Sequence, residues 1–172
     1  MASLYLDESL DASAFAVGST LSIEGDDARH AVQVARVKVG ERIAIGDGRG
    51  RIARGAVIEA SPRSVAIHID EIEDSPLPTP RIRLVQALAK GDRDELAVQA
   101  ATELGVAEVV PWAATRSISR WDGAKAQRGR ARWATIAREA AKQSIRSTVP
   151  LVAELATTAA IARLGGLVLV LD

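Results

Sequence analysis

The chain has 172 residues, which suffices for one ordinary domain or two small ones. Hydrophobic residues make up 48% of it and aromatic residues only 3%, so aliphatic side chains must form the core, and the lack of cysteine excludes disulfide bonds and thiolate metal sites. The net charge of +0 conceals an uneven distribution. Residues 1–75 are acidic, with 8 Lys and Arg against 13 Asp and Glu, and the remaining residues are basic, with 14 Lys and Arg against 9 Asp and Glu.

The sequence shows no sign of a membrane or secretory segment. No apolar run approaches the roughly 20 residues that cross a bilayer. The N-terminus MASLYLDESLDAS carries acidic residues early and lacks the basic start of a secretory signal. We therefore expect a cytoplasmic protein without a membrane partner.

The first part of the chain reads as short strands around one helix. The helix is expected from about Asp26 to Arg36. Asp47-Gly48 followed by Gly50 indicates a hairpin turn. It is not a dinucleotide-binding loop, because the third glycine does not have the spacing of that motif and a strand, not a helix, follows. These features predict a small, mostly β, barrel-like unit. The expected strands are 3–6, 20–23, 41–47, 51–60 and 64–72.

A proline cluster follows these strands. The segment DSPLPTP at 74–80 has three prolines in seven positions, and proline both lacks an amide donor and favours extended neighbours. The segment is therefore typical of a stiff connector, and we expect two compact units joined near it.

After the prolines, the spacing of the apolar residues alternates between that of buried strands and that of helices. This order predicts an α/β layer with a parallel sheet. Asp92 can cap a helix whose apolar positions are Leu96, Ala97, Ala100 and Ala101. A longer helix should bury Trp133, Ile136, Ala137, Ala140 and Ala141. The expected elements are strand 83–89, the helix from Asp92 to Gly105, strand 106–112, helix 122–144, a short helix near 157–164 and a final strand at 167–172.

Basic residues concentrate between Arg116 and Arg146, with nine Lys and Arg against two acidic residues. Arginine dominates this stripe, which suits forked contacts to phosphate oxygens. A solvated helix face would give the same pattern, and charge alone does not separate the two interpretations.

Polar side chains are expected to meet at one edge of the parallel sheet. Lys90 and Arg116 follow the carboxyl ends of two strands, where open α/β sheets place ligands. Gln143 and Arg146 end the long helix and could return to that edge, although Lys90 could equally be a solvated turn lysine. The two histidines, His30 and His68, lie in different elements and lack acidic neighbours at ligand spacing, so we expect no metal site.

Four blocks in order make a family resemblance specific. The chain resembles the ribosomal RNA small subunit methyltransferase E family, enzymes that use S-adenosylmethionine to methylate N3 of a uridine in 16S ribosomal RNA. The blocks are VARVKVGERIAIGDGRG (34–50) after His30, QALAKGDRDELAVQAATELGV (86–106), PWAATRS (111–117) and REAAKQSIRSTVP (138–150).

The resemblance implies a two-domain α+β and α/β architecture. Residues 1–74 would form a PUA-like RNA-binding barrel, 75–80 a linker, and 81–172 the first part of a SPOUT-type methyltransferase domain. The family's glycine-rich loop and knot segment, which hold most of the S-adenosylmethionine pocket, have no match in this sequence. The resemblance therefore implies a truncated trefoil knot, a homodimer for the full-length protein, and an inactive fragment.

The resemblance also assigns roles to residues. Arg116, Lys90 and Arg146 would be catalytic, and Leu171 and Asp172 would reach the lip of the methyl-donor pocket. A non-catalytic module that binds RNA is the alternative. The residues expected to bind the small-subunit RNA are His30, Arg36, Arg49, Arg120, Arg128, Arg130, Arg132 and Gln143.

Overall fold

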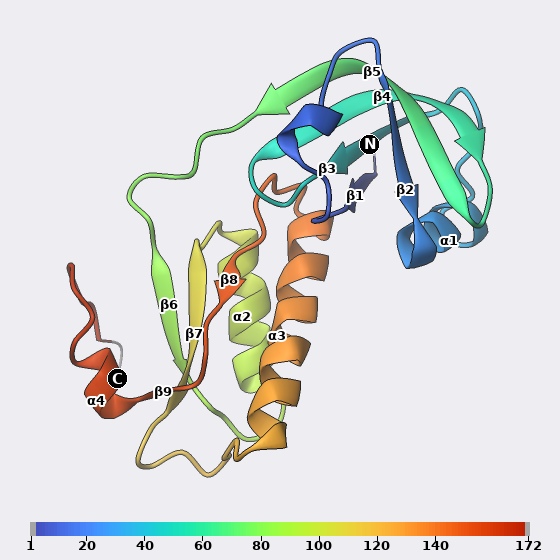
Figure 1. The fold of residues 1–172 in the computed structure, drawn as a ribbon. Coiled ribbons are helices and arrows are strands. Elements are labelled where there is room, and N and C mark those ends of the chain that lie inside the picture. The colour runs from blue at the N-terminus through green and yellow to red at the C-terminus, as the bar shows by residue number, and fades with distance from the viewer. Residues whose placement is uncertain (1–2, 171–172) are drawn as a thin grey trace. The chain divides into compact units, whose positions relative to one another are not determined.

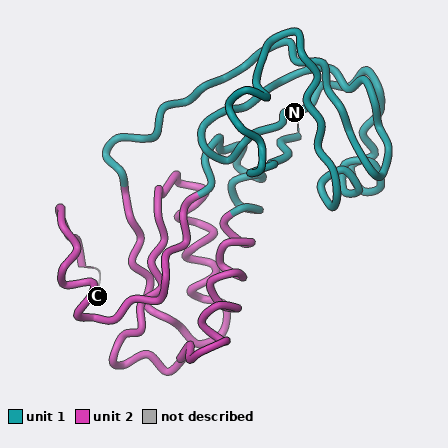
Figure 2. Tube along the Cα trace, in the orientation of Figure 1, with its two compact units in different colours: residues 1–81, 138–149 teal, residues 82–137, 150–172 magenta. Residues whose placement is uncertain are grey.

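The computed structural model describes residues 3–170. The chain divides into two compact units (Figure 2). Unit 1 contains Met1–Arg81 and Arg138–Val149, and unit 2 contains Ile82–Ala137 and Pro150–Asp172. The second segment of unit 1 comes from the region that the sequence assigned to a single domain at 81–172, so the division of the chain is not a single cut.

Unit 1 is built on a mixed five-stranded sheet with the order β1-β3-β4-β5-β2. β1 runs parallel to β3, and the other neighbours are antiparallel. Figure 1 shows β4 and β5 as the two long strands of this sheet. The strands are β1 (Leu4–Leu6), β2 (Thr20–Glu24), β3 (Arg42–Gly46), β4 (Arg51–Ala60) and β5 (Ser64–Asp74), with the 3-10 helix η1 (Ala12–Ala14) and helix α1 (Gly25–Gln33) between them.

The core of unit 1 is aliphatic, as the composition predicted. Alternating residues Val65, Ile67 and Ile69 of β5 are fully buried, and they pack with Ala28 and Ala31 of α1. α1 ends at Gln33 and not at Arg36, because Arg36 has a left-handed backbone (φ 56°) that cannot continue a helix.

An irregular pairing bends the β4–β5 ribbon. The register shifts between Arg54 and Gly55, and again between Val57 and Glu59. A Cβ atom on Gly55 would lie 1.9 Å from the backbone oxygen of His68, so no residue with a side chain fits here.

The loop between β3 and β4 is the predicted hairpin, since Gly46 pairs with Ile52 across it. The carboxylate of buried Asp47 accepts the backbone N–H groups of Arg49 (2.8 Å) and Arg51 (3.0 Å) and holds the turn. Gly48 has φ 67°, which favours glycine at this turn position.

The same loop holds the second segment of unit 1. The N–H of Gly50 donates to the oxygen of Ser147 (2.9 Å), and the N–H of Val149 donates to the oxygen of Gly48 (2.8 Å). Ala141 near the end of helix α3 (Ala124–Gln143) joins a core with Leu6 and other residues of the sheet. These contacts explain why 138–149 belong to unit 1.

Unit 2 is a parallel sheet in the order β6-β7-β8, with β9 also paired to β7. Helices α2 and α3 share a core with it that includes Val98, Val109 and Trp133. The inward face predicted for the long helix is confirmed, with Trp133, Ala137, Ala140 and Ala141 buried. The elements are β6 (Arg83–Ala87), α2 (Arg93–Glu103), β7 (Glu108–Ala113), α3, β8 (Leu151–Val152), β9 (Ala156–Thr157) and α4 (Thr158–Ile161).

Two predictions for this unit are wrong. α2 does not bury Leu96, which is 58% exposed; its buried residues are Asp94, Val98 and Thr102, four apart along one face. The final strand is also absent from the described residues 167–170, which are irregular and between 60 and 90% exposed. They make no pairing with another strand, and a strand needs such a partner for its backbone. Leu171 and Asp172 lie outside the described residues.

No helix in the described part of the chain is long and apolar enough to cross a membrane.

Candidate nucleic-acid interface

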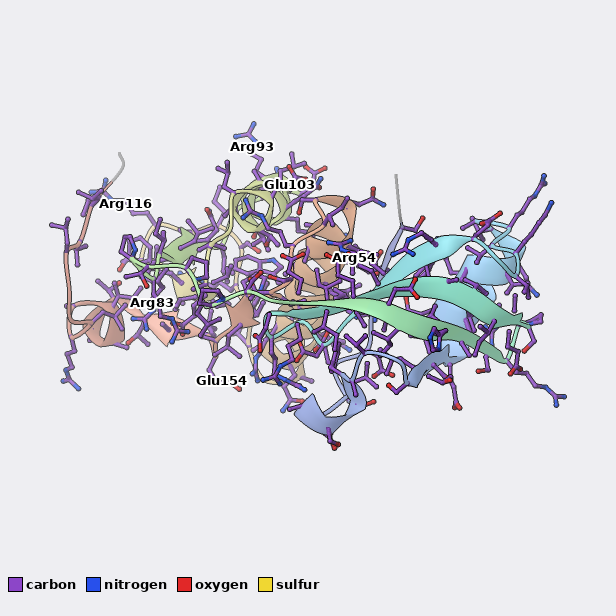
Figure 3. All side chains as sticks on the ribbon, turned by 90° about the horizontal axis from the view of Figure 1, so that it is seen from above. Arg54, Arg83, Arg93, Glu103, Arg116 and Glu154 are labelled. Atoms are coloured by element: carbon purple, nitrogen blue, oxygen red, sulfur yellow. The ribbon has the colours of Figure 1, made fainter. Side chains whose placement is uncertain are left out.

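The carboxyl edge of the unit 2 sheet carries two of the predicted residues. Ala87 at the end of β6 pairs with Trp112 of the parallel strand β7, and Leu88 N–H donates to the oxygen of Trp112 (3.0 Å). Lys90 and Arg116 follow these two strand ends, so both lie at the same edge of the sheet. Both side chains are exposed, and among residues 3–170 neither has an ion-pair partner. Figure 3 labels Arg116 in this part of the chain.

A groove of about 240 Å³ lies next to this edge, within unit 2. The β6–α2 loop, the first turn of α2, the loop before α3 and the start of α3 form its walls. Its lining residues are Ala89, Gly91, Asp94, Glu95, Ser119, Trp121, Lys125, Arg128, Gly129, Arg132 and Trp133.

Two tryptophans give this groove an aromatic wall. Trp121 and Trp133 meet edge to face, with ring centroids 5.1 Å apart and an interplanar angle of 70°. Trp133 is buried, whereas Trp121 is only partly buried. A Cβ atom on Gly129 would lie 2.5 Å from the Trp121 ring, so the ring can pack this closely against α3 only because residue 129 has no side chain.

The charges of the groove are unevenly matched. The Glu95 carboxylate accepts two hydrogen bonds from the Arg132 guanidinium, one from Nε and one from Nη2 (2.7 Å). This contact raises the pKa of Arg132 above its ordinary value. Buried Asp94 accepts the N–H groups of Ala89 (3.1 Å) and Glu95 (3.0 Å). Lys125 and Arg128 are exposed and have no ion-pair partner within the described chain, so they are the available cations.

Other arginines and lysines of the basic stripe are engaged within the protein. Arg130 pairs with Glu154 and donates to the backbone oxygen of Val152 (2.9 Å). In unit 1, Arg138 and Lys142 both pair with Asp27. The expected RNA contacts of Arg130 and Arg132 stay predictions, but both guanidinium groups already form ion pairs within unit 2, Arg130 with Glu154 and Arg132 with Glu95.

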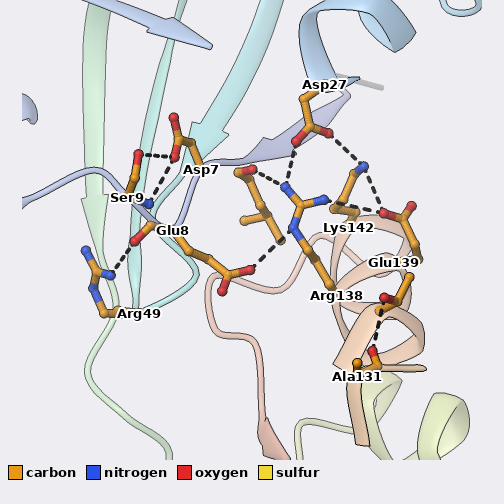
Figure 4. A network of polar contacts seen from close by, with 11 residues as sticks. Asp7, Glu8, Ser9, Asp27, Arg49, Ala131, Arg138, Glu139 and Lys142 are labelled. Carbon is orange, nitrogen blue, oxygen red and sulfur yellow. Dashed lines mark hydrogen bonds and ion pairs between the residues drawn. The ribbon is translucent and has the colours of Figure 1, made fainter. Parts of the chain in front are cut away.

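Asp27 is part of an ionic network in unit 1 that has Arg138 at its centre (Figure 4). Its carboxylate accepts from Arg138 Nη2 (2.6 Å) and Lys142 Nζ (3.0 Å), and Arg138 also contacts Glu8 (3.3 Å). Partial burial opposes ionisation of Asp27, but the two hydrogen bonds outweigh it and hold the pKa of Asp27 below its ordinary value. Burial likewise opposes the charge of Arg138, but the hydrogen bond and charge of Asp27, together with the charges of Glu8 and Glu139, more than offset it and raise the pKa of Arg138.

The network borders a wider groove in unit 1, of about 600 Å³. Four of its lining residues are acidic, namely Asp7, Glu8, Glu24 and Asp27, against the single cation Arg138. This balance disfavours a phosphate ligand. No group of His, Cys, Asp and Glu within residues 3–170 could hold a metal ion.

The predicted RNA-binding residues of unit 1 are spread over several elements. His30 lies exposed in the last turn of α1, and Arg36 lies exposed in the loop after it. Arg49 donates to the backbone oxygens of Glu8 (2.8 Å) and Leu10, which ties its guanidinium to the loop after β1. These positions do not test an RNA contact.

The predicted polar rim is divided between the units. Lys90 and Arg116 belong to unit 2, whereas Gln143 and Arg146 belong to unit 1, where Arg146 N–H caps α3 through the oxygen of Ala141 (2.9 Å). Arg120 is exposed in the loop before α3. Trp121 was not among the predicted site residues, although an aromatic residue amid arginines and lysines is a signal that could have found it.

Comparison with known proteins places these features in a family. Residues 75–171 match the model of the RNA methyltransferase domain, and residues 23–70 match the RNA methyltransferase PUA domain. Ribosomal RNA small subunit methyltransferase E of Mycobacterium bovis is 38% identical over 135 residues, which are 78% of this chain and 52% of that protein. The chain belongs to the ribosomal RNA small subunit methyltransferase E family.

Further members of this family support the assignment. The Bacillus subtilis protein of the same name is 36% identical over 138 residues, covering 79% of this chain and 54% of that protein. The Neisseria gonorrhoeae enzyme of that name, in a crystal structure with bound S-adenosyl methionine, superposes with a TM-score of 0.77 at 29% identity, over 90% of this chain and 62% of that one. The fold is therefore a PUA-like unit followed by a SPOUT-type parallel sheet, as predicted. The chain spans about half the length of the curated relatives it matches.

Proposed function

We propose that the protein methylates ribosomal RNA with S-adenosylmethionine as methyl donor, and that its target is N3 of a uridine in 16S ribosomal RNA of the small subunit. The observation that carries this proposal is the pair of cations Lys90 and Arg116, which have no ion-pair partner among residues 3–170. Both lie at the carboxyl edge of a parallel sheet in a chain of this family. We also propose a cytoplasmic site of action and a homodimer for the whole protein.

The chemistry of uracil explains why cations suit this edge. N3 is an imide nitrogen whose lone pair is unavailable until its proton leaves, and negative charge then spreads onto O2 and O4. A positioned guanidinium or ammonium stabilises that charge as it develops. We assign this role first to Arg116, whose fork can contact a carbonyl oxygen. Lys90, at the same edge of the sheet, is the second candidate and Arg146 the third.

The methyl donor does not fit the same residues. S-adenosylmethionine supplies a methyl group on a positively charged sulfonium, and Lys90 and Arg116 would repel that charge. They therefore suit the RNA side of the reaction. The family resemblance assigns Leu171 and Asp172 to the lip of the donor pocket and the rest of that pocket to residues after them, and we retain this as part of the proposal.

The PUA-like unit would bind RNA next to the target. RNA-modifying enzymes act on a base that has left its stack, and a second unit that binds the flanking strand can present such a base. We propose His30, Arg36 and Arg49 for this contact, together with Gln143. The stripe residues Arg120, Arg128, Arg130 and Arg132 are proposed to bind RNA from unit 2.

Arg116→Ala in the whole protein tests the catalytic assignment. With saturating RNA and enzyme, we expect the single-turnover methylation rate to fall on the order of 100-fold, while the RNA affinity changes little. Arg116→Lys should recover only part of the rate, because a point charge does not reproduce the fork. Arg93→Ala is a matched control, since Arg93 is exposed on α2 and has no ion-pair partner among the described residues.

Two results would contradict the proposal. A normal rate for the Arg116→Ala protein would remove Arg116 from the catalytic residues. Salt-sensitive RNA binding by the whole protein without transfer of a methyl group to N3 would favour the alternative, a non-catalytic RNA-binding module. Mapping of the methylated nucleotide by mass spectrometry separates N3 from other positions.

A further inference from the structure

We propose that the groove between the first turn of α2 and the start of α3 binds one single-stranded ribonucleotide, with its base stacked on Trp121 and its phosphate bound by Lys125 and Arg128. This inference rests on the proposed action on RNA and names the residues of unit 2 that would bind a nucleotide. The groove lies wholly within that unit.

The aromatic wall supplies the surface for a base. The Trp121 ring packs against Gly129 of α3 and makes an edge-to-face contact with Trp133. It nevertheless stays partly exposed and lines the groove. A fixed, partly exposed indole next to arginines and lysines is the combination that proteins use to bind single strands, because every base has a face that can stack.

The available cations lie on one side of the groove. Lys125 and Arg128 are three residues apart on α3, so they share a helix face. Arg132, one turn further along, is matched by Glu95, and Asp94 brings a negative charge to the α2 side. A phosphate is therefore attracted to the α3 side near Lys125 and Arg128 and repelled from the α2 side, which fixes the direction in which a nucleotide would lie.

The size of the groove limits the occupant. At about 240 Å³ it is smaller than the roughly 300–1,000 Å³ typical of pockets for whole ligands or cofactors. One nucleotide of a longer strand fits this size better than a complete cofactor does. A base can reach Trp121 only when it is unstacked, so we expect a preference for single-stranded RNA over duplex RNA.

The test uses the 172-residue chain and a fluorescein-labelled, single-stranded oligouridylate of eight nucleotides, followed by anisotropy at several KCl concentrations. Lys125→Gln and Arg128→Gln should each lower the slope of log K against log salt by about 0.7, the value for one lost phosphate contact on a single strand. Arg93→Gln is the matched control, because its side chain points away from the body of unit 2 in Figure 3 and does not line the groove. It should leave both affinity and slope nearly unchanged.

Trp121 gives an independent readout. Trp121→Leu should weaken binding about tenfold, whereas Trp121→Phe should keep most of the affinity because it retains a ring. Quenching of tryptophan fluorescence by the oligonucleotide should be strong in the original chain and much smaller in Trp121→Phe. The two α3 variants keep the proposal testable if Trp121→Leu does not fold.

The outcomes separate this inference from the proposed function. If the chain binds the oligonucleotide but the groove variants behave like Arg93→Gln, the groove is not a nucleotide site and the methyltransferase proposal still stands. If the groove variants behave as expected but the whole protein transfers no methyl group to RNA, the methyltransferase proposal fails and the groove assignment stands. If the chain binds no RNA at all, the inference is wrong.

Discussion

Asp27→Asn removes one negative charge that two cations of unit 1 share. The Asp27 carboxylate lies 2.6 Å from Arg138 Nη2 and 3.0 Å from Lys142 Nζ. The three side chains are only 18%, 28% and 13% exposed, respectively, so water replaces the lost interactions poorly. Asparagine has nearly the same shape but no charge, and one of its two terminal atoms is a donor that faces a cation.

The magnitude follows from these contacts. A hydrogen bond to a charged group contributes about 1.5–3 kcal/mol when it is shielded from solvent, and an exposed ion pair less than about 1 kcal/mol. Two partly buried bonds to one carboxylate lie between these limits, so we expect a loss of about 2–3 kcal/mol in the free energy of unfolding. With a urea dependence of about 1–3 kcal/mol per molar, the unfolding midpoint of unit 1 should fall by about 1 M.

The effect should depend on pH in a defined direction. The pKa of Asp27 is lowered in the folded chain, so folding favours its ionised form. Its contribution is therefore fully present above the unfolded pKa of about 3.9 and is lost as the pH falls through the lower folded value. The stability difference between the original chain and Asp27→Asn should be largest near neutral pH and should shrink below about pH 4.

The adjacent Asp26 provides a matched control. Its ion pair with Arg29 spans one helical turn and Asp26 is 95% exposed, so Asp26→Asn should change the free energy of unfolding by less than about 0.5 kcal/mol. Urea titrations followed by circular dichroism at pH 7 and pH 3 measure all three proteins. Equal midpoints for the two variants, or a difference from the original chain that persists unchanged at pH 3, would refute the reasoning.

Three further predictions follow from other contacts. Gly55→Ala should destabilise unit 1 by about 3 kcal/mol or more, because the added Cβ would lie 1.9 Å from the His68 oxygen, whereas Gly165→Ala, with nothing within 4 Å, should be neutral in the same urea titration. Glu95→Gln should free Arg132 as a third cation of the groove, and anisotropy should then show tighter oligouridylate binding and a steeper salt slope; unchanged binding would show that Arg132 does not reach the RNA. The 172-residue chain should bind S-adenosylmethionine weakly or not at all in calorimetry, and a stoichiometric micromolar site would contradict the proposed place of the donor pocket.

Local patterns predicted much of the fold. The alternation of Val65, Ile67 and Ile69 placed β5 and its buried face correctly, and Asp47-Gly48 placed the hairpin. Trp133 and Ala137 placed the inward face of α3. In each case the decisive residues are neighbours along the chain, so their spacing alone carries the information.

The same kind of pattern failed where a contact outside the helix or strand itself decides. α2 buries Asp94 and not Leu96, because the Asp94 carboxylate accepts backbone N–H groups, including that of Ala89 in the preceding loop. Residues 167–170 have the composition of a strand, but they make no pairing with another strand within the described chain. An apolar run shows that a segment can be buried, and only a neighbouring element determines whether it is.

Some features of the candidate site could likewise be predicted from the sequence, and others depend on the tertiary structure. The sequence by itself determined the family, the basic character of 116–146 and the place of Lys90 and Arg116 after two strand ends, because order and spacing along the chain encode all three. Only the tertiary structure decided which of these charges are available. Arg132 is matched by Glu95, 37 residues away, and Arg138 by Asp27, 111 residues away, whereas Lys125 and Arg128 stay exposed beside Trp121. An ion pair forms wherever folding brings opposite charges within a few ångströms, and no local period of the sequence records that distance.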